Sequence, residues 1–127
     1  MAPLIVFAPD AGGQQPVAAY GSPGGSGIIN TVLEVTLNLI DFGLSVRESV
    51  EQPRLSLTSA AEKATTAIEA GFDADVLERL SDLGYRFPSP PNDIGAVQAI
   101  VIDRRTGLVD GFADPRRSGR SIGLTAP

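Results

Sequence analysis

The sequence predicts an α+β domain that is built from antiparallel strands and clustered helices. Apolar strand-like runs lie in pairs near both ends of the chain and are separated by short turns, whereas helical periodicity is confined to the middle. The 14 glycines and 10 prolines imply many turns and short elements. A chain of 127 residues suits one domain with a modest core, so residues 1–127 are predicted to form a single domain.

Composition excludes several classes of function. The 15 acidic and 10 basic residues give a net charge of −5, which opposes a broad nucleic-acid-binding surface. The chain has no Cys and no His, so it offers no thiol nucleophile, no zinc site of the usual ligands and no histidine base. No cofactor is implied, and no apolar run is long enough for a membrane span.

The first elements are a hairpin and a long helix. The apolar runs Leu4 to Phe7 and Val17 to Tyr20 flank a turn with the pair Gly12-Gly13, which predicts paired strands. From about Ile28 to Phe42 the pattern is helical, with an apolar arc wider than half the circumference. Such an arc predicts a helix that is buried on two sides.

The middle of the chain carries clear start and stop signals. Ser45 and Glu48 form a capping box for a short helix, which must stop near Gln52 because Pro53 follows. Leu55 to Thr58 alternates like a strand. The stretch 59–70 mixes helix-favouring Ala and Glu with strand-favouring Thr and Ile, so its residues alone leave both states open.

The last third predicts one more helix and a second hairpin. Asp73 is the expected N-cap of a helix that ends at Gly84. The short extended segment from Tyr85 to Phe87 that follows is expected to be a strand. Val97 to Ile102 and Leu108 to Phe112 flank a turn and predict paired strands. The tail after Asp114 is polar and expected to be loosely held, although Asp114-Pro115-Arg116 suggests a turn with an internal ion pair.

Two charged groups are expected to be solvated surface. Half of the basic residues lie in the last quarter, but acidic residues are interspersed and no aromatic residue supports base stacking. The acidic residues of the later helix lie at its N-terminus and outer face, where the helix dipole favours them, so no metal site is expected. These two groups are Arg104, Arg105, Arg116, Arg117 and Arg120, and Asp73, Asp75, Glu78 and Asp82.

The loop Gly21 to Gly27 is the most unusual local feature, with four glycines in seven residues directly before the long helix. One interpretation is a phosphate cradle, but no Lys-Ser/Thr pair follows and the spacing is not G-x-G-x-x-G. A second is an oxyanion hole, in which consecutive backbone N–H groups stabilise a developing negative charge. A third is a tight turn that binds no ligand. The residues alone leave these three open.

Several stretches, taken in order, resemble the C-terminal part of the small subunit of γ-glutamyltransferases (glutathione hydrolases), and the Ser-Pro-Gly-Gly-Ser segment is the most specific of them. The resemblance covers nearly the whole chain. The stretches are MAPLIV at Met1 to Val6, GSPGGS at Gly21 to Ser26, IINTVL at Ile28 to Leu33, SVEQPR at Ser49 to Arg54, GAVQAI at Gly95 to Ile100, and Asp114-Pro115-Arg116.

This resemblance implies a self-processing N-terminal nucleophile hydrolase with an αββα sandwich, of which this chain supplies only part. In that family a threonine, activated by its own α-amino group, attacks γ-glutamyl amides. The positions matching Gly24 and Gly25 offer backbone N–H groups to the oxyanion, and Ala64 to Glu69 matches a strand. Gly27 stands where many relatives have Arg, which is expected to loosen the loop.

The nucleophilic threonine and a serine pair that holds substrate lie upstream of the position matching Met1 in the family. The chain alone is therefore expected to be inactive, and its expected partner is the N-terminal remainder of the enzyme, which would bind glutathione or another γ-glutamyl substrate. No substrate-binding residue is identified within the chain. Bacterial relatives imply a periplasmic or secreted location.

Two alternatives remain beside this hypothesis. The chain could be a stand-alone non-catalytic domain derived from the family that binds a protein partner through its exposed helix face. It could also be a fragment of a related acylase acting on β-lactam side chains or other amides. The residues that would select the substrate lie outside this chain.

Overall fold

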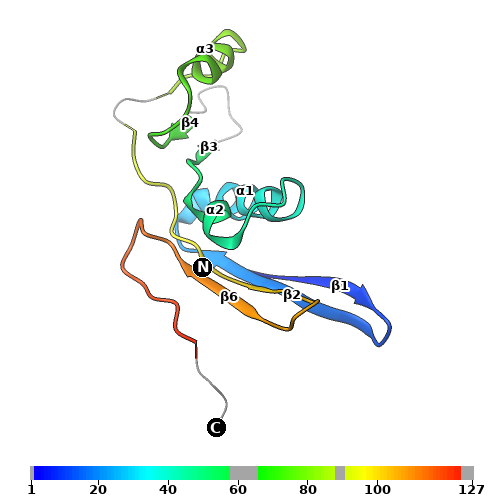
Figure 1. Ribbon diagram of the computed structural model, residues 1–127. Coiled ribbons are helices and arrows are strands. Elements are labelled where there is room, and N and C mark those ends of the chain that lie inside the picture. Colours follow the sequence, from blue (N-terminus) through cyan, green and yellow to red (C-terminus); the bar gives the residue numbers. More distant parts are fainter. Residues whose placement is uncertain (1, 58–65, 88–90, 124–127) are drawn as a thin grey trace.

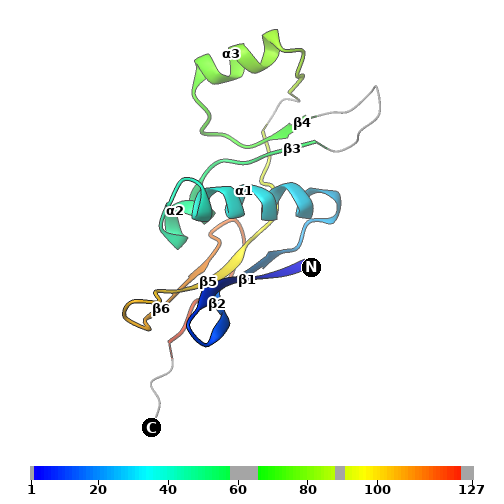
Figure 2. The same cartoon turned by 90° about the vertical axis from the view of Figure 1, so that its right-hand side faces the viewer.

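The computed structural model describes residues 2–57, 66–87 and 91–123 and arranges them in layers (Figures 1 and 2). A four-stranded antiparallel sheet of order β1-β2-β5-β6 has helices α1 and α2 across one face, and the two-stranded sheet β3-β4 with helix α3 lies beyond them. The elements are β1 (Ala2–Asp10), β2 (Gly13–Ser22), the 3-10 turn η1 (Gly25–Gly27), α1 (Ile28–Ile40), α2 (Val46–Glu51), β3 (Leu55–Leu57), β4 (Thr66–Ile68), α3 (Ala74–Asp82), β5 (Gln98–Ile102) and β6 (Val109–Ala113).

Both predicted hairpins are confirmed, and they join to form the large sheet. β1 pairs with β2, β5 pairs with β6, and β2 pairs with β5, all antiparallel. Alternate side chains of these strands point at the helices, which gives the period of two expected for a sheet covered on one face. The core consists of Ala18, Tyr20, Val35, Val46, Val50, Val97 and Ala99.

The two helices over the sheet begin and end where local signals predict. Gly43 has φ +65°, and the N–H of Leu44 donates to the carbonyl of Asn38, so the chain turns sharply after α1. At the start of α2, Ser45 and Glu48 form both hydrogen bonds of the capping box, because the side chain of each accepts the backbone N–H of the other. Helix α1 ends at Ile40, two residues before the predicted Phe42. The last two residues of the predicted helix already belong to the turn that ends it.

The expected burial of α1 on two sides is found only in part. The helix lies between the large sheet and β3-β4 (Figure 2), but a stripe along its length stays exposed. Ile29, Leu33 and Ile40 are 77%, 53% and 57% exposed. An apolar stripe of this kind on a helix indicates a surface that contacts another chain or segment.

A buried ion-pair network joins the layers. The side chain of Arg54 is 2% exposed, and its guanidinium lies 2.8 Å from the Asp114 carboxylate. Arg116 makes a two-point contact with Glu69, at 2.7 and 2.6 Å, and also donates to Asp114. Such two-point contacts are among the stronger charge-assisted hydrogen bonds. The four side chains therefore form one continuous cluster between β3-β4 and the end of β6.

The same network also holds backbone. Glu69 accepts the N–H groups of Arg54 and Ile94, while Asp114 accepts those of Val97 and Arg116. Burial alone would raise the pKa of the Asp114 carboxyl, but these N–H donors and the Arg54 charge outweigh it, so its pKa lies below the usual value.

Three expectations about the later part of the chain are corrected. Tyr85 to Phe87 forms no strand, although the carbonyl of Arg86 accepts one hydrogen bond from β4. Asp73 occupies the N-cap position of α3, but its side chain makes no capping hydrogen bond. The predicted loose tail is wrong at Arg116, whose side chain is 11% exposed because Glu69 and Asp114 hold it. The predicted Asp114–Arg116 ion pair is confirmed.

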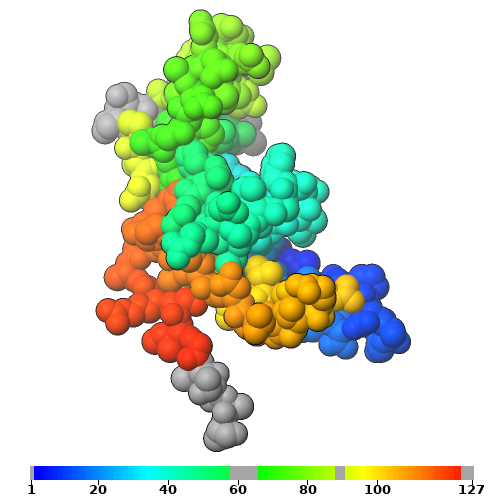
Figure 3. Space-filling model, in the orientation of Figure 1, coloured from blue at the N-terminus to red at the C-terminus, as the bar shows by residue number. Residues whose placement is uncertain are grey.

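The predicted strand in 64–69 is found at Thr66–Ile68, and the rest of the ambiguous stretch up to residue 65 lies outside the described residues. Helix α3 follows and lies at one end of the molecule (Figure 3). None of its residues is fully buried: Val76 is 38% exposed, and Leu77 and Leu80 are half-buried. Within the described ranges no helix is both long and apolar enough to cross a membrane.

Asp114→Asn is expected to destabilise the chain strongly, because it leaves the buried Arg54 charge without its counter-ion. Breaking a buried pair by removing one partner typically costs about 3–5 kcal/mol. The free energy of unfolding in urea at pH 7 measures the effect. The control is Glu51→Gln, which removes the exposed Arg47–Glu51 pair on α2 and should cost less than about 1 kcal/mol. Equal losses for the two variants would contradict this role of the network.

Candidate functional site

The glycine loop joins the end of β2 to the start of α1, and its backbone requires glycine at two positions. Gly24 has φ +139° and Gly25 has φ +58°, conformations that residues with a Cβ rarely adopt. A Cβ on Gly24 would also lie 3.4 Å from the α-carbon of Gly95. The positive φ angles of the backbone are therefore enough to explain why glycine occupies both positions.

The hydrogen bonds of the loop leave two N–H groups available. Gly27 donates to the carbonyl of Gly24, and Ile28 donates to that of Gly25, which forms the single turn η1 ahead of α1. In the described part of the chain, no hydrogen bond uses the N–H of Gly24 or Gly25. Both residues are exposed, and both precede a helix whose dipole favours negative charge at this end.

The inner side of the loop is fixed to the sheet by Ser22. This fully buried hydroxyl donates to the carbonyl of Pro23 at 2.6 Å and accepts the N–H of Ala96 at 2.9 Å. The segment 94–97 that carries Ala96 is itself held by Glu69 and Asp114. The loop therefore combines an open outer side, with free donors, and a rigid inner side.

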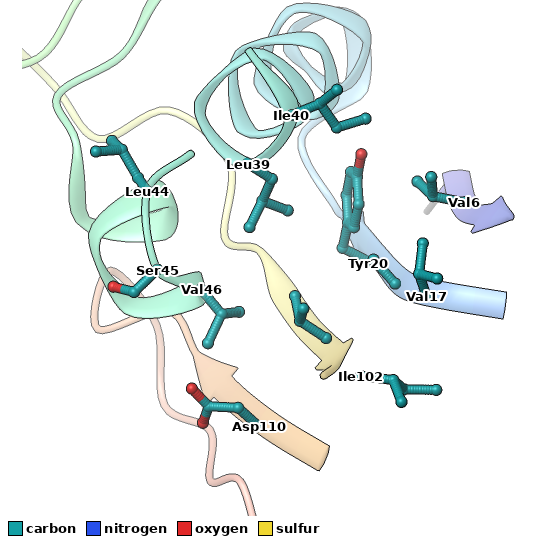
Figure 4. Close-up of a pocket in the computed structure, with 12 residues that line it drawn as sticks. Val6, Val17, Tyr20, Leu39, Ile40, Leu44, Ser45, Val46, Ile102 and Asp110 are labelled. Atoms are coloured by element: carbon teal, nitrogen blue, oxygen red, sulfur yellow. The ribbon is translucent and has the colours of Figure 1, made fainter. Parts of the chain in front are cut away.

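One largely apolar hollow lies away from this loop. A cavity of about 310 Å³ opens between the sheet and the second half of α1, lined by Val6, Tyr20, Leu39 and Val46 among others (Figure 4). Tyr20 points from β2 toward α1, where its hydroxyl bonds that of Thr36. Asp110 is the one charged residue of the lining, so no set of polar groups converges there for chemistry.

A carboxyl group with a raised pKa lies on the opposite side of α1. Burial raises the pKa of Glu34 to about 7, against the opposing effects of the Leu55 N–H and the Arg54 charge. One oxygen accepts that N–H at 3.1 Å, and the other is buried with no partner among the described residues. The sequence gives no signal for this, because Glu34 lies in the polar stripe of an amphipathic helix.

Comparisons with known proteins agree with one another on the family. The family model Gamma-glutamyltranspeptidase matches residues 1–124. The chain belongs to the γ-glutamyltranspeptidase family. A Bacillus subtilis glutathione hydrolase proenzyme is 40% identical over 124 residues, which are 98% of this chain and 20% of that protein. An Escherichia coli glutathione hydrolase proenzyme is 36% identical over 96 residues, 76% of this chain and 16% of that protein.

A solved structure of this family shares the fold. The Helicobacter pylori γ-glutamyltranspeptidase T380A mutant superimposes with a TM-score of 0.79 at 35% identity, covering 92% of this chain and 61% of that chain. The expected fold, an α+β part of an N-terminal nucleophile hydrolase, is confirmed by this likeness. The chain spans about a fifth of the length of the curated relatives it matches.

The predicted site residues of this chain lie together in the loop. Gly24 and Gly25 are consecutive, exposed and free to donate, while their role as oxyanion donors stays a prediction. Gly27 has φ −75° and ordinary contacts at 3.6 Å, so this position does not need glycine. Sequence reasoning missed Ser22 as the residue that ties the loop to the segment before β5, because its partner Ala96 lies 74 positions away.

Gly24→Ala and Gly27→Ala should have opposite effects on stability. The first forces a Cβ into a positive φ and is expected to cost roughly 1–3 kcal/mol. The second keeps a helical conformation and, by restricting the unfolded chain, is expected to gain about 0.4–1 kcal/mol. Urea unfolding of the two variants beside the natural sequence measures both. A loss at position 27 as large as that at 24 would show that this description of the loop is wrong.

Glu34→Gln should stabilise the chain at pH 8 and leave it nearly unchanged at pH 4. The folded pKa lies above the unfolded value, so ionisation weakens the fold as pH rises from the ordinary glutamate pKa to about 7. Glutamine stays neutral throughout and removes this effect. Thermal melts at the two pH values measure it. Glu78→Gln, on the exposed surface of α3, is the control and should shift the melting temperature equally at both.

Proposed function

We propose that this chain supplies the oxyanion-stabilising part of a γ-glutamyltransferase or glutathione hydrolase. The observation that carries the proposal is the pair of free N–H groups of Gly24 and Gly25 at the start of α1. Two adjacent backbone donors at a helix N-terminus suit an oxygen that gains negative charge during acyl transfer. The 40% identity with a glutathione hydrolase proenzyme supports γ-glutamyl amides as the substrate class.

In this proposal the nucleophile belongs to the part of the enzyme that precedes the segment matched here. A threonine hydroxyl, deprotonated by its own α-amino group, attacks the γ-glutamyl carbonyl and gives a tetrahedral oxyanion. Gly24 and Gly25 donate to that oxygen. The intermediate collapses, the amine leaves with a proton, and water or an amino acid then takes the acyl group. Each donor of this kind contributes about 2.7–4 kcal/mol to the transition state.

The threonines of this chain do not take the nucleophile's place in this proposal. Thr31 is fully buried, and Thr36 donates to the carbonyl of Val32 within α1. Thr66 is buried in β4, and Thr106 lies in the exposed turn before β6. Thr58, Thr65 and Thr125 lie outside the described residues. Because the proposal places the nucleophile in the preceding part of the enzyme, the chain by itself is expected to have no activity.

The exposed apolar surfaces support a larger enzyme as the partner. Ile5 and Ile100 both pair across to Ala19 and lie on the sheet face away from the helices, 57% and 47% exposed. The stripe of α1 with Ile29 and Leu33 is exposed as well. Apolar surface of this extent on both outer sides is what a second sheet and flanking segments would cover in a four-layer sandwich.

A chimera tests the proposed function. The full chain replaces the matched 124-residue segment in the Bacillus subtilis glutathione hydrolase proenzyme, and hydrolysis of a γ-glutamyl anilide is followed per titrated active site. We expect an active chimera in which Gly24→Ala lowers kcat about 100- to 1,000-fold. Alanine keeps the N–H, but its Cβ is strained at φ +139° and forces this donor away from the oxyanion. Gly27→Ala is the matched control and should keep the activity within about threefold.

Two outcomes contradict the proposal. One is a folded chimera without activity, which favours the non-catalytic alternative. The other is a chimera in which the Gly24 and Gly27 variants are equally active, which would remove the oxyanion role from the loop.

A further inference from the structure

The direction of the Gly24 N–H is set by a hydrogen bond at the other end of the same peptide unit. The carbonyl of Pro23 and the N–H of Gly24 belong to one planar peptide and point in opposite directions. The Ser22 hydroxyl donates to that carbonyl at 2.6 Å. Since Ser22 is fully buried while Gly24 is exposed, holding the carbonyl inward turns the N–H outward.

The next peptide unit is fixed differently. The carbonyl of Gly24, which shares a peptide with the N–H of Gly25, accepts from the N–H of Gly27 at 3.1 Å. This bond lies within the loop and needs no side chain. Among the described hydrogen bonds, Ser22 is therefore the one side chain that acts on the two donor peptides.

The hydrogen bonds of the Ser22 hydroxyl fix the direction in which it donates. It accepts the N–H of Ala96 at 2.9 Å, so its hydrogen is left to donate to Pro23. Gly95 keeps the space for it: a Cβ there would lie 2.6 Å from the Ser22 oxygen and 2.9 Å from the Thr31 oxygen. Gly95 also has φ +70°, so the backbone and the packing both require glycine.

We propose that Ser22 is a positioning residue of the acyl-transfer reaction, seated by Ala96 and Gly95, which aims the Gly24 N–H at the oxyanion. This inference rests on the proposed function. Ser22 touches neither substrate nor nucleophile in this arrangement. Its hydroxyl acts through the Pro23–Gly24 peptide, and its loss should therefore affect the transition state more than the bound substrate.

Ser22→Ala in the active chimera tests this. We expect the acylation rate, from single turnovers of a γ-glutamyl anilide, to fall about ten- to hundred-fold, as a small misalignment of a catalytic group does. The dissociation constant of a non-reactive γ-glutamyl analogue should stay within about threefold, because it lacks the oxyanion. Ser22→Thr, which keeps the hydroxyl, should restore most of the rate.

Thr31→Val is the matched control. Thr31 is as fully buried as Ser22 and borders the same space beside Gly95, but its hydroxyl has no partner among the described residues. Removal of this hydroxyl should leave the acylation rate within about threefold. If Ser22→Ala does not yield folded enzyme, Ser22→Cys, with its weak S–H donor, is measured in its place against the same expectation.

A double-mutant cycle adds a second measurement. Gly95→Ala should lower the acylation rate, since its methyl group meets the Ser22 oxygen. In combination with Ser22→Ala the loss should be smaller than the product of the two single losses, because that contact no longer exists.

The outcomes separate this inference from the function on which it rests. A folded chimera that is inactive before any substitution overturns the proposed function. An active chimera that loses rate with Gly24→Ala but not with Ser22→Ala leaves the proposed function standing and overturns the role of Ser22. Equal losses for Ser22→Ala and Thr31→Val also overturn it, since a general packing effect would then explain both.

Discussion

The pairing of Arg54 with Asp114 inside the molecule is the interaction on which the rest of the arrangement depends, because neither charge could stay buried without the other. Arg116 and Glu69 extend this pair into a cluster. Its remaining donors and acceptors bind backbone of α2, of Arg54 just before β3 and of the segment before β5. The small sheet contributes little apolar burial to the main core. Charge and hydrogen bonding, more than apolar packing, therefore fix β3-β4 over the large sheet.

This cluster reaches the candidate site through one short segment. Glu69 holds the N–H of Ile94 and Asp114 holds that of Val97, so the backbone between them has a fixed path. Within that path the Ala96 N–H meets the Ser22 hydroxyl at the base of the glycine loop. The loop's outer donors are thus connected to the ion pairs by a chain of neighbouring hydrogen bonds, with no flexible link between the two.

Local signals were enough to predict most elements, because turns, caps and periodicity act between near neighbours. The two hairpins, the capping box at Ser45 and the stop at Gly43 are all of this kind. Features that depend on distant partners were not predictable. Apart from the local Asp114–Arg116 and Arg54–Val50 contacts, the network joins residues 15 to 66 positions apart, and the Ser22–Ala96 bond spans 74. The strand expected at Tyr85 to Phe87 failed for the same reason, since only its surroundings decide whether a short extended segment pairs.

The site residues show the same division between features that local sequence predicts and features that it does not. The backbone need for glycine at positions 24 and 25 could be suspected from composition, whereas the resemblance to a family was needed to connect it with acyl transfer.

The ion-pair cluster also affects the order in which parts of the fold can form during synthesis. Asp114 and Arg116 leave the ribosome after every other member of the cluster, and domains assemble as their residues emerge. The hairpin β1-β2 and helix α1 can form early, but the backbone beneath the glycine loop is complete only when this last turn has been made. The glycine loop, and with it the proposed donors, would then reach its final geometry late in synthesis.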